Sequence, residues 1–143
     1  MPSAIEHLQN LLRTGKLKAE PPDQVEFQGL IRSAERKLPD AQNASLSEDS
    51  RFSLAYDAAH SLALAALRWH GYRSEARYIV FQVLGDTASL ATEKWRFLDN
   101  CHMKRNAALY EGAQIADESL IRELIAVTKE LHAAVRALGA VGG

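Results

Sequence analysis

The chain has 143 residues, of which 47% are hydrophobic, and its 17 basic and 18 acidic residues give a formal net charge of −1. These values suit one domain with a substantial core and do not indicate a strongly basic nucleic-acid-binding protein. The single cysteine, Cys101, excludes an internal disulfide and suits a reducing compartment. No apolar run approaches the roughly 18 residues of a membrane span, and the N-terminal pattern is not that of a signal peptide, so we expect a cytoplasmic protein without membrane contact.

Two helical patterns open the chain. Apolar residues at helical spacing predict a first helix over residues 3–14. A second apolar stripe follows Asp23 and Glu26, which have the spacing of a capping pair, and Pro39 should end this helix. We predict that residues 1–44 form a two-helix extension packed on the main bundle.

A third helix is predicted to begin with a capping box formed by Ser45 and Glu48 and to run to about His70. Much of its buried face is alanine, and small side chains allow neighbouring helices to come close. We therefore expect it to be the central helix. These alanines are Ala55, Ala59, Ala63 and Ala66.

The run from Tyr78 to Leu84 is rich in β-branched and aromatic residues, which are compatible with a strand or a short helix. No second strand-like run exists to pair with it, and a lone strand is unstable. We predict a short buried helix that begins near Ser74 and is ended by Gly85.

Two longer helices complete the predicted bundle. The first should begin within residues 87–90 and end at Gly112. Residues 112–116 should form a turn, and Asp117 should cap the last helix.

These patterns predict an all-α, single-domain bundle of five or six helices with no sheet. The bundle proper would span residues 45–139, followed by a disordered tail over residues 140–143. The chain has no phosphate-binding loop or dinucleotide fingerprint, and its five histidines show no metal-ligand spacing. We therefore predict no metal and no cofactor.

The stretch from Trp95 to Gly112 combines an apolar stripe with a polar centre. Helical spacing places His102 and Arg105 on one face between Leu98 and Leu109, where an ordinary buried face would have aliphatic residues. Polar groups inside an apolar stripe cost stability unless they are paired or used. This conflict is the clearest functional indication in the sequence.

Two segments resemble the HEPN superfamily of helical bundles, which occurs in nucleotide-binding and defence proteins. Residues 55–60, Ala-Tyr-Asp-Ala-Ala-His, and the alanine-rich helix that follows to Gly71 are similar to the family's signature helix. Residues 104–110, Lys-Arg-Asn-Ala-Ala-Leu-Tyr, are similar to its second hallmark. In that hallmark an Arg, often followed by Asn, Asp or His, precedes a His by a short spacer. The resemblance covers residues 45–138 and implies an HEPN-like bundle.

In active HEPN proteins, the Arg and the His are implied to cleave RNA without a metal, through attack of the ribose 2′-hydroxyl on the adjacent phosphate. By this resemblance Arg105, with Asn106 and Lys104, would bind RNA or phosphate, because a guanidinium fits phosphate oxygens. Tyr110 stands where the catalytic His is expected. A phenol with a pKa near 10 is a poor general base at neutral pH, so the substitution weakens the case for cleavage.

His102, one turn before Arg105, is a candidate replacement for the missing catalytic His, and a buried structural histidine is the alternative. Tyr56, Asp57 and His60 would support the motif from the signature helix. For Arg105 the alternative to phosphate binding is a structural ion pair with an aspartate, either Asp57 or Asp99.

The resemblance implies an RNA- or nucleotide-binding protein of the toxin–antitoxin or defence type, with weak or lost metal-independent endoribonuclease activity. It also implies a homodimer that pairs through the helices bearing the Arg motif, and an antitoxin or a nucleotidyltransferase as a partner. The alternative is a non-catalytic helical module for protein–protein interaction.

Overall fold

The computed structural model describes residues 3–112 and 117–142 and is 73% helical. Seven helices and one two-stranded sheet occur in these residues. In chain order they are α1 (Ala4–Arg13), β1 (Lys18–Ala19), α2 (Gln24–Ala41), α3 (Glu48–Trp69), β2 (Tyr72–Arg73), α4 (Arg77–Gln82), α5 (Leu84–Thr87), α6 (Thr92–Glu111) and α7 (Glu118–Arg136). The mainly helical class is confirmed, whereas the prediction of five or six helices and no sheet is wrong.

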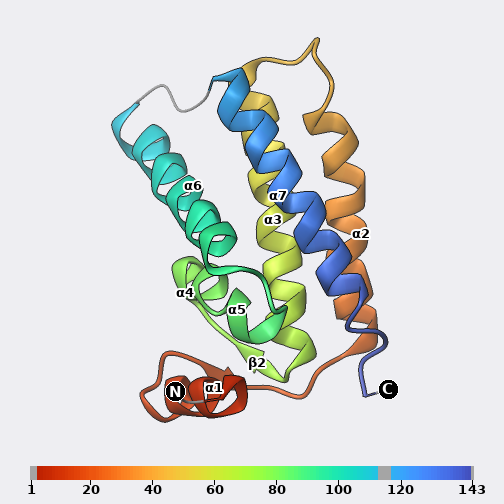
Figure 1. The fold of residues 1–143 in the computed structure, drawn as a ribbon, viewed down its shortest axis with the longest axis vertical. Helices are drawn as coiled ribbons and strands as arrows, with labels where there is room; N and C mark the ends of the chain where they lie inside the picture. The colour runs from red at the N-terminus through yellow and green to blue at the C-terminus, as the bar shows by residue number, and fades with distance from the viewer. Residues whose placement is uncertain (1–2, 113–116, 143) are drawn as a thin grey trace.

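Helices α2, α3 and α7 build the centre of the molecule, and α3 packs against both of the others (Figure 1). Helix α3 buries a series of alanines completely. Because these side chains are small, the neighbouring helices can approach closely, and α3 is the central helix as predicted. The fully buried alanines are Ala55, Ala58, Ala59, Ala63, Ala65 and Ala66.

A buried arginine joins the ends of these three helices. Arg51, in the first turn of α3, donates from Nε to the carbonyl oxygen of Ala41 at the end of α2 over 2.8 Å. Its Nη1 donates to Oε2 of Glu118 at the start of α7 over 2.6 Å. Arg51 therefore satisfies a terminal carbonyl of α2 and connects α3 to α7 at the same time.

Helix α2 differs from the prediction at both ends. Asp23 caps it by accepting from the N–H of Val25 over 3.2 Å, but Glu26 binds an arginine of α3 and completes no capping pair. Pro39 lies inside the last turn instead of ending the helix. The helix continues past it because a proline at this position removes only one backbone donor near the helix end.

Helix α3 is capped by Ser47 rather than by Ser45. The side chain of Ser47 accepts from the N–H of Ser50 over 3.1 Å. The N–H of Ser45 donates to the side chain of Asn43 over 3.0 Å in the preceding loop. This local turn uses the serine that the sequence pattern assigned to the cap.

The segment between α3 and α6 forms two short helices, and Gly85 lies inside the second one instead of ending the first. A glycine costs a helix about 1 kcal/mol without preventing a helical turn.

The long helix α6 begins at Thr92, later than predicted, and Gly112 ends it in the left-handed region with φ of 67°. Asp117 caps α7 as predicted, accepting a backbone N–H over 2.8 Å. The predicted turn over residues 112–116 lies, after Gly112, outside the described residues.

The sheet pairs two connectors that are far apart in the sequence. Strands β1 and β2 are antiparallel, with Lys18 opposite Arg73, and the N–H of Glu20 donates to the carbonyl of Gly71 over 3.0 Å. Each strand has two residues, which is too short for an alternating pattern to indicate it in the sequence. The prediction of no sheet failed for this reason.

Arg68 fixes this sheet to the end of α3, and its side chain is only 2% exposed. Its Nε donates to Oε1 of Glu26 over 2.5 Å. Arg73 also binds the carboxylate of Glu26, over 3.1 Å. Three backbone carbonyls accept from the Arg68 guanidinium over 2.9 to 3.2 Å: those of Glu20, Pro21 and Tyr72.

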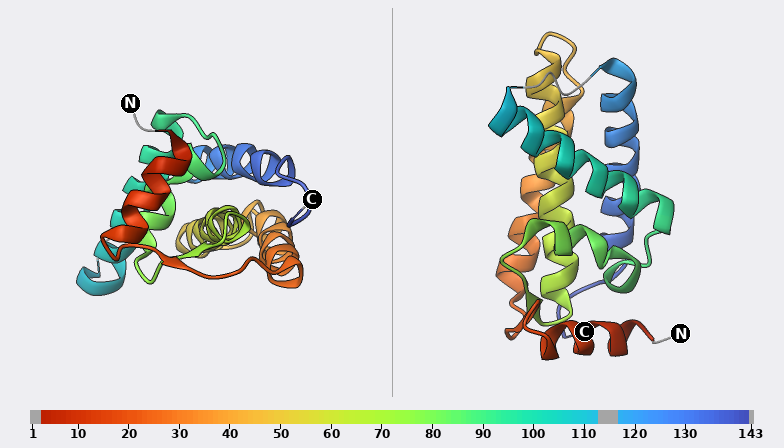
Figure 2. Two further views of the ribbon diagram at one scale, coloured as in Figure 1. Left: turned by 90° about the horizontal axis from the view of Figure 1, so that it is seen from below. Right: turned by 90° about the vertical axis from the view of Figure 1, so that its left-hand side faces the viewer.

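Helix α6 crosses the side of the bundle at an angle to α3 and packs mainly on α4 (Figure 2). Its buried residues are Leu98 and Cys101. Beyond them, Met103, Leu109 and Tyr110 are 62%, 63% and 80% exposed. The predicted stripe therefore leaves the core after its first half, and the expectation that Leu109 continues the buried stripe is wrong.

Helix α1 lies across one end of the bundle (Figure 2). Leu8 is its buried residue, and Nδ1 of His7 contacts the carboxylate of Asp86 in α5. Near the other end of the chain, the N–H of Val141 donates to Oε1 of Gln24 over 2.7 Å. None of the helices in the part of the chain that the structure describes is long and apolar enough to cross a membrane.

Candidate functional site

A hydrogen bond between α3 and α6 lies at the centre of the candidate site. Tyr56, on α3, is fully buried. Its hydroxyl oxygen lies 2.9 Å from Nδ1 of His102, on α6. Tyr56 and His102, which precedes the segment 104–110, therefore belong to one site, although 46 positions separate them in the sequence.

Arg105 lies on the same aromatic ring. Its Cζ is 4.9 Å from the centroid of Tyr56, which is a cation–π geometry. In the described residues, no carboxylate oxygen lies within 4.0 Å of its guanidinium nitrogens. The structural ion pair with Asp57 or Asp99 is therefore not formed, and Asp99 instead accepts from the side chain of Gln82 over 3.3 Å.

The amide of Asn106 occupies the second nitrogen of His102. Its Nδ2 lies 3.3 Å from Nε2 of the imidazole. With the amide nitrogen as donor, the neutral imidazole carries its proton on Nδ1 and donates it to the hydroxyl oxygen of Tyr56. Both nitrogens of His102 thus have partners inside the protein, and a substrate would have to displace one of them.

Phe81, on α4, forms the apolar side of the site. Its ring centroid is 5.8 Å from Tyr56, 5.9 Å from His60 and 6.3 Å from His102. His60 also stacks on Tyr56, with centroids 6.4 Å apart. We refer to Tyr56, His60, Phe81, His102 and Arg105 together as the Tyr56–His102 cluster.

Burial and nearby positive charges keep both imidazoles neutral. Burial lowers the pKa of His60 to about 4, and the positive charges of Arg77 and Arg105 add to this effect. Burial also lowers the pKa of His102; Asp99 acts in the opposite direction, and the two arginines act in the same direction as burial. At neutral pH, His102 is therefore in the form that can accept a proton.

Burial raises the pKa of Tyr56, and the charges of Arg77 and Arg105 partly oppose the rise. The phenol therefore stays protonated at neutral pH. One arginine of α4 and one of α6 therefore act on the same hydroxyl.

Comparisons of the chain with protein-family models, curated proteins and solved structures find no match. The site itself therefore carries the evidence for function.

The structure does not bring every predicted residue into this group. Tyr110 is 80% exposed and lies about 12 Å from His102 along the helix axis. Lys104 is exposed, and Asp57 is half-buried beside Tyr56. Among the described residues, no hydrogen bond or ion pair connects Lys104 or Tyr110 to the Tyr56–His102 cluster.

The sequence reasoning missed Arg77 and Phe81. Both lie on α4, a segment that was predicted only as a short buried helix. The available signal was their spacing of one helical turn, which places an arginine and an aromatic residue on the same face.

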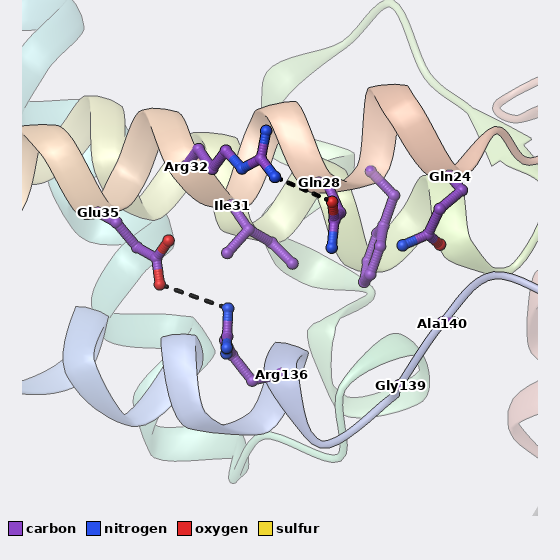
Figure 3. A pocket seen from close by; sticks show the side chains of 9 residues that line it. Gln24, Gln28, Ile31, Arg32, Glu35, Arg136, Gly139 and Ala140 are labelled. Carbon is purple, nitrogen blue, oxygen red and sulfur yellow. Dashed lines mark hydrogen bonds and ion pairs between the residues drawn. The ribbon is translucent and has the colours of Figure 1, made fainter.

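A groove of about 430 Å³ lies elsewhere, between α2 and the end of α7 (Figure 3). Phe27 and Ile31 line it together with polar side chains. Arg136 on its wall already pairs with Glu35 over 3.5 Å. None of its lining residues belongs to the Tyr56–His102 cluster.

The described residues contain no group of three or more His, Cys, Asp or Glu side chains that could hold a metal ion. Cys101 is a buried residue of α6, and burial raises the pKa of its thiol to about 12. A thiol with this pKa is unreactive at neutral pH and behaves as a small apolar side chain.

Proposed function

We propose that this chain is an HEPN-like protein that binds RNA or a nucleotide, and that the Tyr56–His102 cluster holds a phosphate group of this ligand. The observation that supports this proposal is the position of Arg105. This half-buried residue places its guanidinium over the Tyr56 ring and has no carboxylate partner among the described residues. A guanidinium that the protein leaves unpaired but positions against a ring is suited to bind an anion.

The same geometry supports weak or lost ribonuclease activity. A neutral His102 is a chemically suitable general base, but Tyr56 and Asn106 occupy its two nitrogens. Tyr110, the residue at the expected His position, is 80% exposed and lies about two helical turns beyond His102. Binding by Arg105 is thus better supported than catalysis.

The exposed half of α6 supports the proposed homodimer. Met103, Leu109 and Tyr110 expose apolar surface on the helix that carries Arg105. Pairing through this surface would bring two copies of the Tyr56–His102 cluster near one interface. The toxin–antitoxin or defence role, and an antitoxin or nucleotidyltransferase partner, rest on the resemblance to HEPN proteins.

A non-catalytic protein-interaction module is the second candidate, and the same exposed residues favour it. If the surface of Met103, Leu109 and Tyr110 binds another protein, Leu109→Ser should abolish that complex, while Arg105→Ala should leave it intact. If the Tyr56–His102 cluster binds a phosphate of RNA, Arg105→Ala should weaken RNA binding and Leu109→Ser should not.

The binding proposal is tested by fluorescence anisotropy with a labelled single-stranded RNA. Arg105→Ala should weaken binding about tenfold or more without lowering the melting temperature, and Arg105→Lys should restore part of the loss because lysine lacks the planar fork. Lys129→Ala, which removes an exposed cation of α7, is the matched control and should bind like the wild type. Wild-type binding by Arg105→Ala would refute the proposal.

Cleavage is tested by incubating total RNA with the protein in chelator and analysing the ends produced. Tyr110→His should create or raise metal-independent cleavage, with a pH dependence near that of imidazole. If the wild type cleaves and His102→Ala abolishes the reaction, His102 is the acid–base group and Tyr110 is not required.

A further inference from the structure

We infer that Arg77, a residue outside both HEPN-like segments, is the second phosphate-binding side chain of the Tyr56–His102 cluster. Arg77 and Arg105 would hold one phosphate of a single-stranded RNA backbone between α4 and α6. This inference rests on the proposed function and assigns it a substrate class.

The position of Arg77 follows from its helix. Arg77 is the first residue of α4 and precedes Phe81 by one helical turn, so both side chains lie on the same face. The ring of Phe81 contacts Tyr56 and His102, which fixes that face toward the cluster. Helix α4 also packs on α6, which carries Arg105, so the two arginines approach the cluster from two elements.

The pKa shifts of the cluster agree with this position of Arg77. Its guanidinium lowers the pKa of His60, His102 and Tyr56, and Arg105 acts in the same direction on all three groups. Two nearby acidic side chains have the opposite effect, each on one group. Asp57 raises the pKa of Tyr56, and Asp99 raises the pKa of His102. Lys37 of α2 adds a further positive charge near His60.

Arg77 is exposed and Arg105 is half-buried, and the remaining described arginines that are at least partly buried have acidic partners. Arg51 pairs with a glutamate over 2.6 Å, Arg68 over 2.5 Å and Arg73 over 2.7 Å. In the described residues, neither Arg77 nor Arg105 has a carboxylate oxygen within 4.0 Å. An anion from outside the protein would supply the charge that these two guanidinium groups lack.

The cluster favours the backbone of RNA over its bases. Two guanidinium groups from different helices can contact the two non-bridging oxygens of one phosphodiester. The buried ring of Tyr56 is covered by the protein and offers no face on which a base could stack. Contacts to phosphates carry no sequence information, so binding should not depend on sequence.

The test measures anisotropy with labelled oligouridine and oligoadenine of equal length at several salt concentrations. Both RNAs should bind the wild type with similar affinity. Arg77→Ala and Arg77→Gln should each weaken binding about tenfold and reduce the salt slope by about 0.7, which corresponds to one lost phosphate contact on a single strand. Combined with Arg105→Ala, Arg77→Ala should add less than its own effect, because both residues serve one phosphate.

Arg96→Ala is the matched control, because Arg96 lies over Trp95 with Cζ 5.6 Å from the ring and outside the cluster. It should keep wild-type affinity and slope. Wild-type binding by both Arg77 variants, with a loss in Arg105→Ala, would overturn the role of Arg77 and leave the proposed function intact. Wild-type binding by all of these variants would remove the proposed function itself.

Competition separates the two sources of a phosphate. Unlabelled RNA of either sequence should displace the label, whereas a free nucleoside triphosphate at the same phosphate concentration should displace much less. Complete displacement by the nucleotide would overturn the RNA-backbone assignment and make a free nucleotide the ligand.

Discussion

Acid should destabilise this fold through His60. The imidazole is half-buried against the rings of Tyr56 and Phe81, and its pKa falls from an ordinary value of 6.5 to about 4 in the folded protein. The positive charges of Arg77, Arg105 and Lys37 act on it, and so does the imidazole of His102 when it is protonated. Protonation of His60 would therefore place a further positive charge in a covered and already positive site.

The direction in which folding stability changes with pH follows from the pKa values of His60 in the folded and unfolded chain. Between about pH 6.5 and pH 4, the unfolded chain binds a proton at this position and the folded chain does not. Folding stability is therefore complete above about pH 6.5 and decreases as the pH falls toward 4. At about 1.4 kcal/mol for each tenfold difference in proton affinity, the loss approaches about 3 kcal/mol.

The assay is urea unfolding followed by circular dichroism at several pH values between about 7 and 4. Carboxylates also lose ion pairs in this range, so the informative quantity is the difference between the wild type and His60→Gln. The variant should lose about 3 kcal/mol less than the wild type over this range. His132→Gln, which removes an imidazole paired with Glu35 on the surface, should retain the part of the loss that His60 causes.

Equal pH dependence in His60→Gln and in the wild type would refute this account of the site. The result would mean that His60 is protonated in the folded protein near its ordinary pKa. An NMR titration of the His60 ring provides an independent value, and its midpoint should lie near pH 4.

Four further substitutions test the fold. Ala63→Leu, at a fully buried position of α3, should overpack the contact with a neighbouring helix and lower the unfolding free energy by roughly 1–3 kcal/mol, as should Ala59→Leu; neutral urea-unfolding results for both would contradict close helix packing. Arg68→Met should cost about 3–5 kcal/mol in the same assay, because Glu26 and three carbonyls lose a buried donor, and an unchanged midpoint would show that the ion pair is unimportant. Gly112→Ala should cost about 1–2 kcal/mol, because φ is 67° there, and an equally stable variant would indicate that α6 ends differently.

The long helices were predictable because their signals are local. The alanine-rich face of α3 predicts a central helix, and Asp117 and Gly112 mark helix ends through the chemistry of one residue each. The same local reasoning failed at Ser45, where a competing turn with Asn43 uses the expected cap.

The sheet and the contacts of the Arg68 side chain were not predictable, because the residues that contact each other there are distant in the sequence. Arg68 binds Glu26 across 42 positions, and no periodic pattern encodes such a pair. A two-residue strand such as Lys18–Ala19 is likewise defined only by the residues opposite it.

The candidate site was predictable in part. The polar residues His102 and Arg105 interrupt an apolar stripe, and this interruption identifies them without a structure. Arg77 shows no such conflict, because an exposed arginine at the start of a short helix is unremarkable by itself. Its role emerges only when Phe81 places that helix against Tyr56.

The bridge made by Arg51 has a consequence for the order in which the chain folds. Helices α2 and α3 are adjacent in the sequence, so a short loop brings them together at a small entropic cost. Helix α7 returns to α3 across a much longer stretch of chain, and its partner Glu118 meets Arg51 only at that point. We expect the α2–α3 hairpin to form early in refolding, with the bond from Arg51 to Ala41 closing its corner. In this order Arg51→Met would slow folding, whereas Glu118→Gln would mainly speed unfolding.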